Sequence, residues 1–226
     1  MAFNNYGNRF QQSSTIVLNL IIINVLAYLA LTLAGPRTFH LFALHHYKSE
    51  LFQPYQIVTH MFMHGGFFHL LFNMFALWMF GTQVERAWGP KRFLIFYLIC
   101  GLGAAFTQLA SYAYEFRNVD YNMITQLNVT AYEESVVSAT VGASGAIMGV
   151  LAAYGYLFPN TEMIIFPIPI PIKAKWAIAG IIALDVFGGV QRVEGDNVAH
   201  FAHVGGAAIG FLLVLFWNKT NKKTFY

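Results

Sequence analysis

The sequence contains very few charged residues. Of its 226 residues, 10% are Asp, Glu, Lys or Arg and 57% are hydrophobic, and the mean hydropathy is +0.53. Soluble domains carry about a quarter charged residues, so this chain cannot cover a water-facing surface of its size. We therefore expect an all-α, polytopic protein whose solvent is the lipid bilayer. The formal net charge of +3 is too small to indicate a nucleic-acid partner.

Cysteine and metal-binding motifs are also scarce. Cys100 is the single cysteine, so the chain cannot form an internal disulfide. It lies in the middle of an apolar stretch. The pairs His60–x3–His64 and His200–x2–His203 have the spacing of metal ligands, but no carboxylate sits beside them. No span contains H-E-x-x-H either. The sequence therefore favours an activity without metal or cofactor, and a metal site is the rival use of these histidines.

Long apolar runs predict six transmembrane helices, each placing about 20 residues across roughly 30 Å of hydrocarbon. The spans are Thr15 to Leu33, about Ile57 to Val84, Phe93 to Tyr114, Gly142 to Asn160, Trp176 to Gln191 and Asn197 to Asn218. The segment "FPIPIPIK" alternates proline with apolar residues, so we expect an extended connector between the fourth and fifth spans. These boundaries give a tail at 1–14, a six-helix membrane domain at 15–218 and a basic tail at 219–226.

The distribution of positive charge predicts the orientation. If the N-terminus is cytoplasmic, nine of the thirteen Lys and Arg residues lie on the cytoplasmic side. These nine are Arg9, Arg86, Lys91, Arg92, Lys173, Lys175, Lys219, Lys222 and Lys223. The positive-inside rule then favours both termini in the cytoplasm. The short tails favour a bacterial plasma membrane, that is, the cell (inner) membrane.

A serine opens the fourth span, in the stretch "VGASGAIMGV". Ser144 falls in the first helical turn, where backbone N–H groups lack partners and the helix dipole would stabilise an oxyanion. The alternative is an N-cap or a small-residue packing contact. GxxxG spacing at Gly145 and Gly149, and again at Gly206 and Gly210, lets two backbones approach as closely as a Ser–His hydrogen bond requires.

Histidines and an asparagine are the other polar residues within the spans. His200 and His203 share a face of the sixth span, where ionisable groups are expensive and indicate function; packed neutral histidines are the alternative. His69 and Asn73 share a face of the second span and could donate N–H groups to an oxyanion. Helix–helix hydrogen bonding is the alternative for Asn73. The sequence assigns no role to Asp185, which lies deep in the short fifth span.

The depth of these residues gives an independent indication. Each candidate helix runs from outside to inside, and we count residues from the candidate to the first polar residue at the cytoplasmic end. The counts are 16 from His69 to Glu85, 16 from Ser144 to Asn160 and 15 from His203 to Asn218. At 1.5 Å per residue, all three lie roughly 22–24 Å above the inner boundary, as a shared site predicts.

Four motifs give the chain a family resemblance. "GASG" contains Ser144, "AHVGG" contains His203, "HLLFN" runs from His69 to Asn73, and "ERAWG" follows the second span. With these motifs in order along nearly the whole chain, the sequence resembles the rhomboid family of intramembrane serine proteases. Together the motifs are highly specific, although each one alone is not.

The resemblance implies a compact six-helix bundle that cleaves single-span membrane proteins within or beside the span. Ser144 would be the nucleophile and His203 the general base, as a dyad without a third acid. The Ser144 N–H, His69 and Asn73 would hold the oxyanion, and His200 would lie one turn outward. The short fifth helix, which carries Asp185, is the candidate gate for a substrate arriving from lipid.

The sequence departs from the family pattern at two places and leaves rival functions open. Tyr55-Gln56 stands where many members have Trp-Arg in the first connection, and Met148 stands where some members have a Tyr stacked on the histidine. A non-proteolytic rhomboid-like protein that binds membrane clients is the main alternative. A transporter or channel would need polar residues along a continuous path, whereas here they gather at one depth.

Overall fold

The computed structural model describes residues 15–115, 117, 139–165, 168–191 and 198–220, and most of these are helical. In chain order the helices are α1 (Thr15–Ala34), α2 (Pro36–Phe42), α3 (Gln56–Thr59), the 3-10 turn η1 (His60–Phe62), α4 (Phe67–Ala76), the π-helical turn η2 (Leu77–Gly81), α5 (Thr82–Trp88), α6 (Pro90–Glu115), α9 (Ser144–Leu157), α10 (Ala174–Gln191) and α11 (His200–Thr220). Both terminal tails expected from the sequence lie outside the described residues, except that α11 continues to Thr220.

Five helices among the described residues are long and apolar enough to cross a membrane. They are Thr15–Ala34, Phe67–Trp88, Pro90–Glu115, Ala174–Gln191 and His200–Asn218. Their outward faces carry large exposed apolar side chains, such as Leu26 at 60%, Phe72 at 67% and Leu184 at 71% exposure. A surface of this kind requires lipid rather than water as its solvent. The chain is therefore a multi-pass helical membrane protein.

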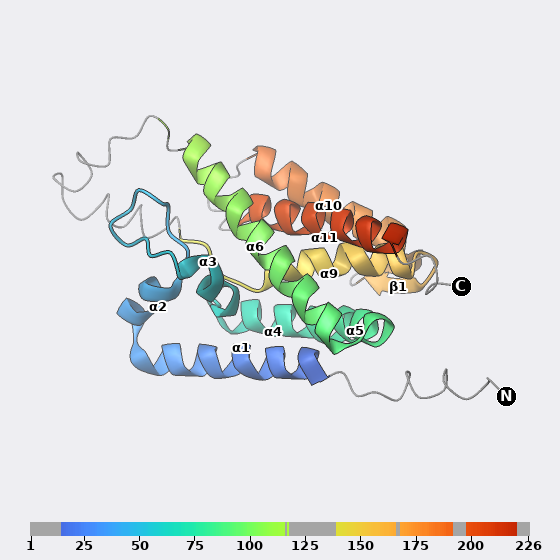
Figure 1. The fold of residues 1–226 in the computed structure, drawn as a ribbon, viewed down its shortest axis with the longest axis horizontal. Helices are drawn as coiled ribbons and strands as arrows, with labels where there is room; N and C mark the ends of the chain where they lie inside the picture. The colour runs from blue at the N-terminus through green and yellow to red at the C-terminus, as the bar shows by residue number, and fades with distance from the viewer. Residues whose placement is uncertain (1–14, 116, 118–138, 166–167, 192–197, 221–226) are drawn as a thin grey trace.

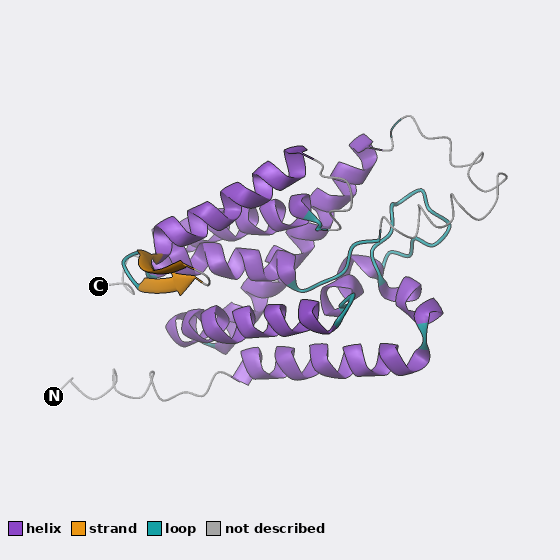
Figure 2. Ribbon diagram, turned by 180° about the vertical axis from the view of Figure 1, so that it is seen from behind, coloured by secondary structure: helices purple, strands orange, loops and turns teal. Residues whose placement is uncertain are grey.

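The sixth expected span, α9, is apolar but only 14 residues long. Its residues Gly145 to Tyr154 are all buried, and α11, α6, α10 and η2 pack around it. Figures 1 and 2 show α9 between the pair α10–α11 on one side and α4, α5 and α1 on the other. Because protein rather than hydrocarbon surrounds α9, its length need not match the thickness of the lipid core.

Glycines bring α9 and α11 into direct backbone contact. A Cβ atom at Gly206 would collide with the carbonyl group of Gly145, and one at Gly210 would lie 2.6 Å from the Gly149 Cα. A Cβ at Gly149 would lie 2.5 Å from the Cys100 Sγ on α6 and 2.9 Å from the Gly206 carbonyl oxygen on α11. The close approach predicted from the two GxxxG patterns is thus confirmed, and the lone cysteine is a buried packing residue.

The second span begins later than the sequence predicted. Instead of one helix from about Ile57, the chain forms α3 and η1, leaves helical geometry at Met63, and starts α4 at Phe67. Consecutive glycines, Gly65 and Gly66, disfavour a continuous helix at this point. The fourth span begins at Ser144 rather than Gly142, whose φ of +126° is incompatible with a helix.

The remaining boundaries shift by a few residues. The fifth helix begins at Ala174, directly after a strand, instead of at Trp176. The sixth begins at His200, and the residues just before 198 lie outside the described part.

The proline-alternated connector is extended, as expected, and forms a hairpin. Strand β1 (Glu162–Ile165) pairs antiparallel with β2 (Ile168–Lys173), with Glu162 opposite Lys173. The prolines at 169 and 171 alternate along β2, so missing N–H groups fall on one edge of this two-stranded sheet. Figure 2 shows the hairpin at the end of the bundle where α10 begins.

Two buried polar side chains fix the N-terminal third of the fold. Glu85, on α5, accepts hydrogen bonds from Ile16 N (3.0 Å) and Val17 N (2.9 Å) and so caps α1. Gln56, fully buried, donates to the carbonyl oxygens of Leu51 (2.8 Å) and Leu41 (3.2 Å). Gln56 therefore anchors the first connection at the place where the sequence departs from the family pattern.

Candidate active site

Ser144 and His203 form a direct hydrogen bond across the α9–α11 contact. The distance from His203 Nε2 to Ser144 Oγ is 2.7 Å, and both side chains are partly buried. Ser144 is the first residue of α9, and His203 lies one turn into α11. Figure 1 shows α4, α9 and α11 beginning toward the same end of the bundle, which agrees with the common depth inferred from the sequence.

The segment before Ser144 is held in place by the surrounding elements. The backbone N–H of Gly142 donates to the carbonyl oxygen of His60 at 2.9 Å, and the Thr140 hydroxyl bonds the Tyr112 hydroxyl at 2.6 Å. Ser144 then begins a helix whose first N–H groups have no intrahelical partner. This local geometry gives Ser144 a fixed position beside unpaired backbone donors.

His69 faces the same space from α4. Its Nδ1 accepts a long hydrogen bond from Gly65 N (3.4 Å), which places the proton of a neutral ring on Nε2. A Cβ atom at Gly142 would lie 2.8 Å from that Nε2 and 3.4 Å from Ser144 Oγ. The volume kept open by Gly142 is therefore bordered by a His69 N–H donor and by the serine oxygen.

Asn73 lies one turn after His69 on α4 and is buried. Its Nδ2 donates to the carbonyl oxygen of His69 at 2.9 Å, which is a bond within its own helix. This bond uses one of its two amide protons. The structure therefore places His69 beside Ser144. The side-chain hydrogen bond of Asn73, in contrast, stays within α4.

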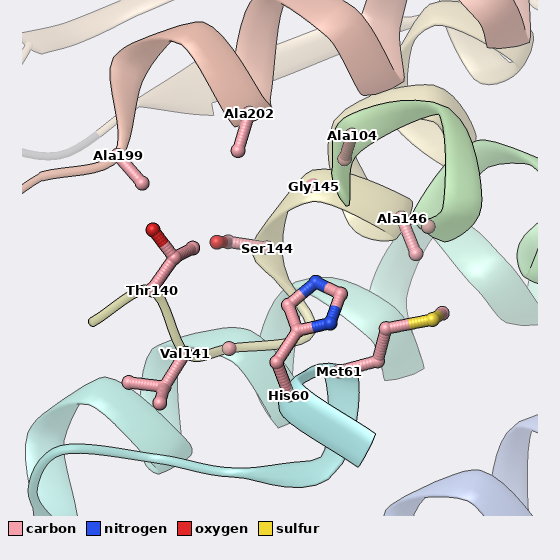
Figure 3. A pocket seen from close by; sticks show the side chains of 12 residues that line it. His60, Met61, Ala104, Thr140, Val141, Ser144, Gly145, Ala146, Ala199 and Ala202 are labelled. Carbon is pink, nitrogen blue, oxygen red and sulfur yellow. The ribbon is translucent and has the colours of Figure 1, made fainter. Parts of the chain in front are cut away.

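A small cavity lies next to Ser144, and His60 forms part of its wall. Figure 3 shows the His60 ring and the Thr140 hydroxyl in this cavity, with Ala199 and Ala202 at the opposite side. His60 Nδ1 is 2.9 Å from the Gln56 carbonyl oxygen, to which it donates. Burial lowers the pKa of His60 to about 4, so the ring is neutral at neutral pH. The sequence singled out His60 only as a metal ligand.

Asp185 is the group that sequence reasoning left without a role. Its Oδ1 lies 2.9 Å from His203 Nδ1 and 2.8 Å from His200 Nδ1, so one carboxylate contacts both histidines of α11. The only signal for Asp185 in the sequence is that an ionisable residue lies within an apolar span.

A metal site is the other use considered for these histidines. The described residues contain no group of three or more His, Cys, Asp or Glu arranged to hold an ion.

Comparison of the sequence with known protein families identifies one family over most of the chain. The profile described as Rhomboid domain matches residues 51–219. This chain belongs to the rhomboid family. The match includes α4, α9 and α11, so the Ser144–His203 pair lies within the rhomboid domain.

Curated rhomboid proteins from distant organisms are similar to the chain. Rhomboid protease AarA of Providencia stuartii is 35% identical over 161 residues, which are 68% of this chain and 52% of AarA. Rhomboid protein 1, mitochondrial, of Saccharomyces cerevisiae is 30% identical over 167 residues, 74% of this chain and 43% of the yeast protein. The human presenilin-associated rhomboid-like protein, mitochondrial, is 31% identical over 156 residues, 69% of this chain and 36% of the human protein. This rhomboid thus spans about half or less of the length of these relatives.

Proposed function

We propose that this rhomboid is an intramembrane serine endopeptidase with a six-helix membrane domain. The observation that carries the proposal is the 2.7 Å hydrogen bond between His203 Nε2 and Ser144 Oγ, because a serine needs an adjacent base to become a nucleophile. Membership in a family that includes a named rhomboid protease supports the same reaction class.

The proposed reaction is acyl transfer to serine. Ser144 Oγ attacks the scissile carbonyl carbon while its proton moves to His203 Nε2. His203 then gives that proton to the leaving amine as the C–N bond breaks, and water hydrolyses the acyl-serine with His203 again acting as base. The reaction requires no metal or cofactor.

The oxyanion of the tetrahedral intermediate is proposed to lie in the space beside Gly142. His69 Nε2 and Ser144 Oγ border that space. The proposed donors are His69 Nε2, the Ser144 backbone N–H and the second amide proton of Asn73. Donors fixed in a water-poor site stabilise developing charge strongly, and removing one typically costs about 10²–10³ in kcat.

The proposed substrates are single-span membrane proteins, cut within or beside the span. A helix must unwind before it reaches Ser144, so substrates with weak helix formers near the scissile bond should be cleaved fastest. We further propose the cell (inner) membrane as the location, with both termini cytoplasmic, since most Lys and Arg residues lie on that side. The yeast and human relatives carry mitochondrial names, so a mitochondrial inner membrane is the competing location.

Cleavage of a tagged single-span protein in liposomes tests the proposal. The native protein should cut the substrate, and Ser144→Ala and His203→Ala should lower the rate by at least about 10³-fold, because each removes one member of the nucleophile–base pair. His200→Ala, one turn away on α11, should retain measurable cleavage and distinguishes the two histidines.

The alternative function, binding of membrane clients without cleavage, predicts a different result. A non-proteolytic rhomboid-like protein would bind membrane clients without cutting them, and Ser144→Ala would leave that binding unchanged. If the native protein cuts none of several substrates with destabilised helices, the protease proposal is wrong and client binding takes its place.

A further inference from the structure

Asp185 is an inward-facing carboxylate on a helix whose neighbouring residues face lipid. Its side chain is 11% exposed, whereas Leu184 and Val186 on either side are 71% and 46% exposed. A carboxylate within a membrane span is costly unless it is paired with other polar groups. Both of the partners found here, His200 and His203, come from the neighbouring helix α11.

The contact between Asp185 and His203 fixes where the proton sits on the imidazole. An ionised carboxylate only accepts hydrogen bonds, so His203 Nδ1 must donate to Asp185 Oδ1 across their 2.9 Å distance. A neutral imidazole carries one proton, which leaves the Nε2 lone pair directed at Ser144 Oγ, 2.7 Å away. This tautomer is the one that can remove the serine proton.

The local sequence of α10 makes room for this arrangement. A Cβ atom at Gly188, one turn after Asp185, would lie 2.5 Å from His200 Cε1 and 2.6 Å from its Nε2. At Gly189 a Cβ would come within 3.2 Å of the His200 Cβ. Because these two residues lack side chains, α11 approaches α10 closely enough for one carboxylate oxygen to reach both histidines.

We propose that Asp185 is a positioning residue for catalysis, which orients His203, selects its Nε2-acceptor tautomer and stabilises the imidazolium formed when Ser144 is deprotonated. The proposal rests on the proposed protease function and replaces a simple dyad with a chain of three groups on α9, α11 and α10. Asp185 stays ionised throughout, and the transferred proton resides on His203 Nε2 until the leaving amine receives it.

One consequence concerns α10, which the sequence suggested as the gate for substrate. Since the group that orients His203 is carried by α10, the enzyme is competent only while α10 is docked on α11 at the level of Asp185. A substrate that enters beside α10 must therefore leave this contact intact or restore it before cleavage.

The test compares Asp185→Asn with the native protein in detergent, with Leu184→Ala as the lipid-facing control on the same helix. Asn keeps the size of the side chain but no longer selects one tautomer. We expect kcat to fall by about 10²-fold or more with KM changed less than about threefold, because Asp185 does not touch the substrate. Asp185→Glu restores a carboxylate and should recover at least about tenfold of the lost kcat. Leu184→Ala should match the native protein.

A second readout does not depend on cleavage. ¹⁵N spectra of histidine-labelled protein, assigned by comparison with His203→Ala, should show His203 protonated at Nδ1 in the native protein and not uniformly so in Asp185→Asn. Native kcat in Asp185→Asn, a loss that only follows a fall in folded protein, or an unchanged His203 tautomer would overturn the proposal. If the native protein fails to cleave but the tautomer depends on Asp185, the protease function fails and the positioning role stands.

Discussion

At the scale of single residues, the site depends on what Gly142 leaves empty. Its φ of +126° turns the chain into α9, and its missing side chain keeps open the volume between His69 Nε2 and Ser144 Oγ. Non-glycine residues rarely adopt that backbone conformation. One glycine therefore serves both the backbone turn and the space in which we propose the oxyanion forms.

Gly142→Ala tests this double role. The added methyl group would lie 2.8 Å from His69 Nε2, so we expect kcat to fall by about 10²–10³-fold, as for the loss of an oxyanion donor. Gly180→Ala on α10 is the matched control, because a Cβ there meets nothing within 4 Å. Kinetics of a fluorogenic transmembrane substrate measure both, and native kcat in Gly142→Ala would contradict the assignment.

At the scale of helices, α1 is attached to the bundle through its N-terminus. Val17, Leu20 and Asn24 of α1 are buried, and four further apolar residues of α1 are only partly buried against the core. Glu85 on α5, 3% exposed, accepts from two of the N–H groups that begin α1 and complements the positive end of its dipole. A carboxylate more than sixty residues away in sequence thus replaces the usual local cap.

Glu85→Ala should loosen this helix. One buried and one partly buried N–H group would lose a charged acceptor, which destabilises the fold by about 2–3 kcal/mol. Thermal unfolding in detergent should show a lower Tm, and limited proteolysis should cut between α1 and α4 more rapidly. Glu162→Ala, on the exposed hairpin strand β1, is the control and should melt like the native protein. Equal Tm values for Glu85→Ala and the native chain would show that packing alone holds α1.

At the scale of the whole molecule, the candidate site and the hairpin lie toward opposite ends of the helical bundle (Figure 1). The starts of α4, α9 and α11 gather Ser144, His69 and His203 toward one end, and the hairpin and the end of α11 lie at the other (Figure 1). Two basic residues lie at the hairpin end: Lys173 is the last residue of β2, and Lys175 is in the first turn of α10. The proposed orientation therefore puts the site near the outer surface, where water can enter as the second reactant.

Reporter fusions in a bacterial host test that orientation. Green fluorescent protein fused after Tyr226 should fluoresce, because it folds in the cytoplasm, whereas alkaline phosphatase fused there should be inactive. Alkaline phosphatase fused after Glu134, in the acidic connection before the fourth span, should be active. The opposite pattern at both sites would invert the topology and place Ser144 near the cytoplasmic side.

The sequence by itself determined the features that depend on local composition and spacing. Apolar runs located five membrane-crossing helices to within a few residues, except at the start of the second one, since hydropathy averages over a window and does not detect the break at Gly65. The small-residue spacing at Gly206 and Gly210 predicted the contact with α9, because a helix presents every fourth residue on the same face. The choice of His203 rather than His200 as the partner of Ser144 came from the resemblance to the rhomboid family, because both histidines lie on the same face of the sixth span.

The tertiary structure alone decided the partners of Asp185, the space at Gly142 and the cap that Glu85 provides. Each is a contact between residues far apart in the chain, and it depends on the rotation of one helix about its axis relative to another. The hydropathy of α10 is nearly uniform around the helix, so its sequence could not tell which face meets α11. Only the packed bundle turns Asp185 toward His203, and that rotation determines which nitrogen of the imidazole faces the serine.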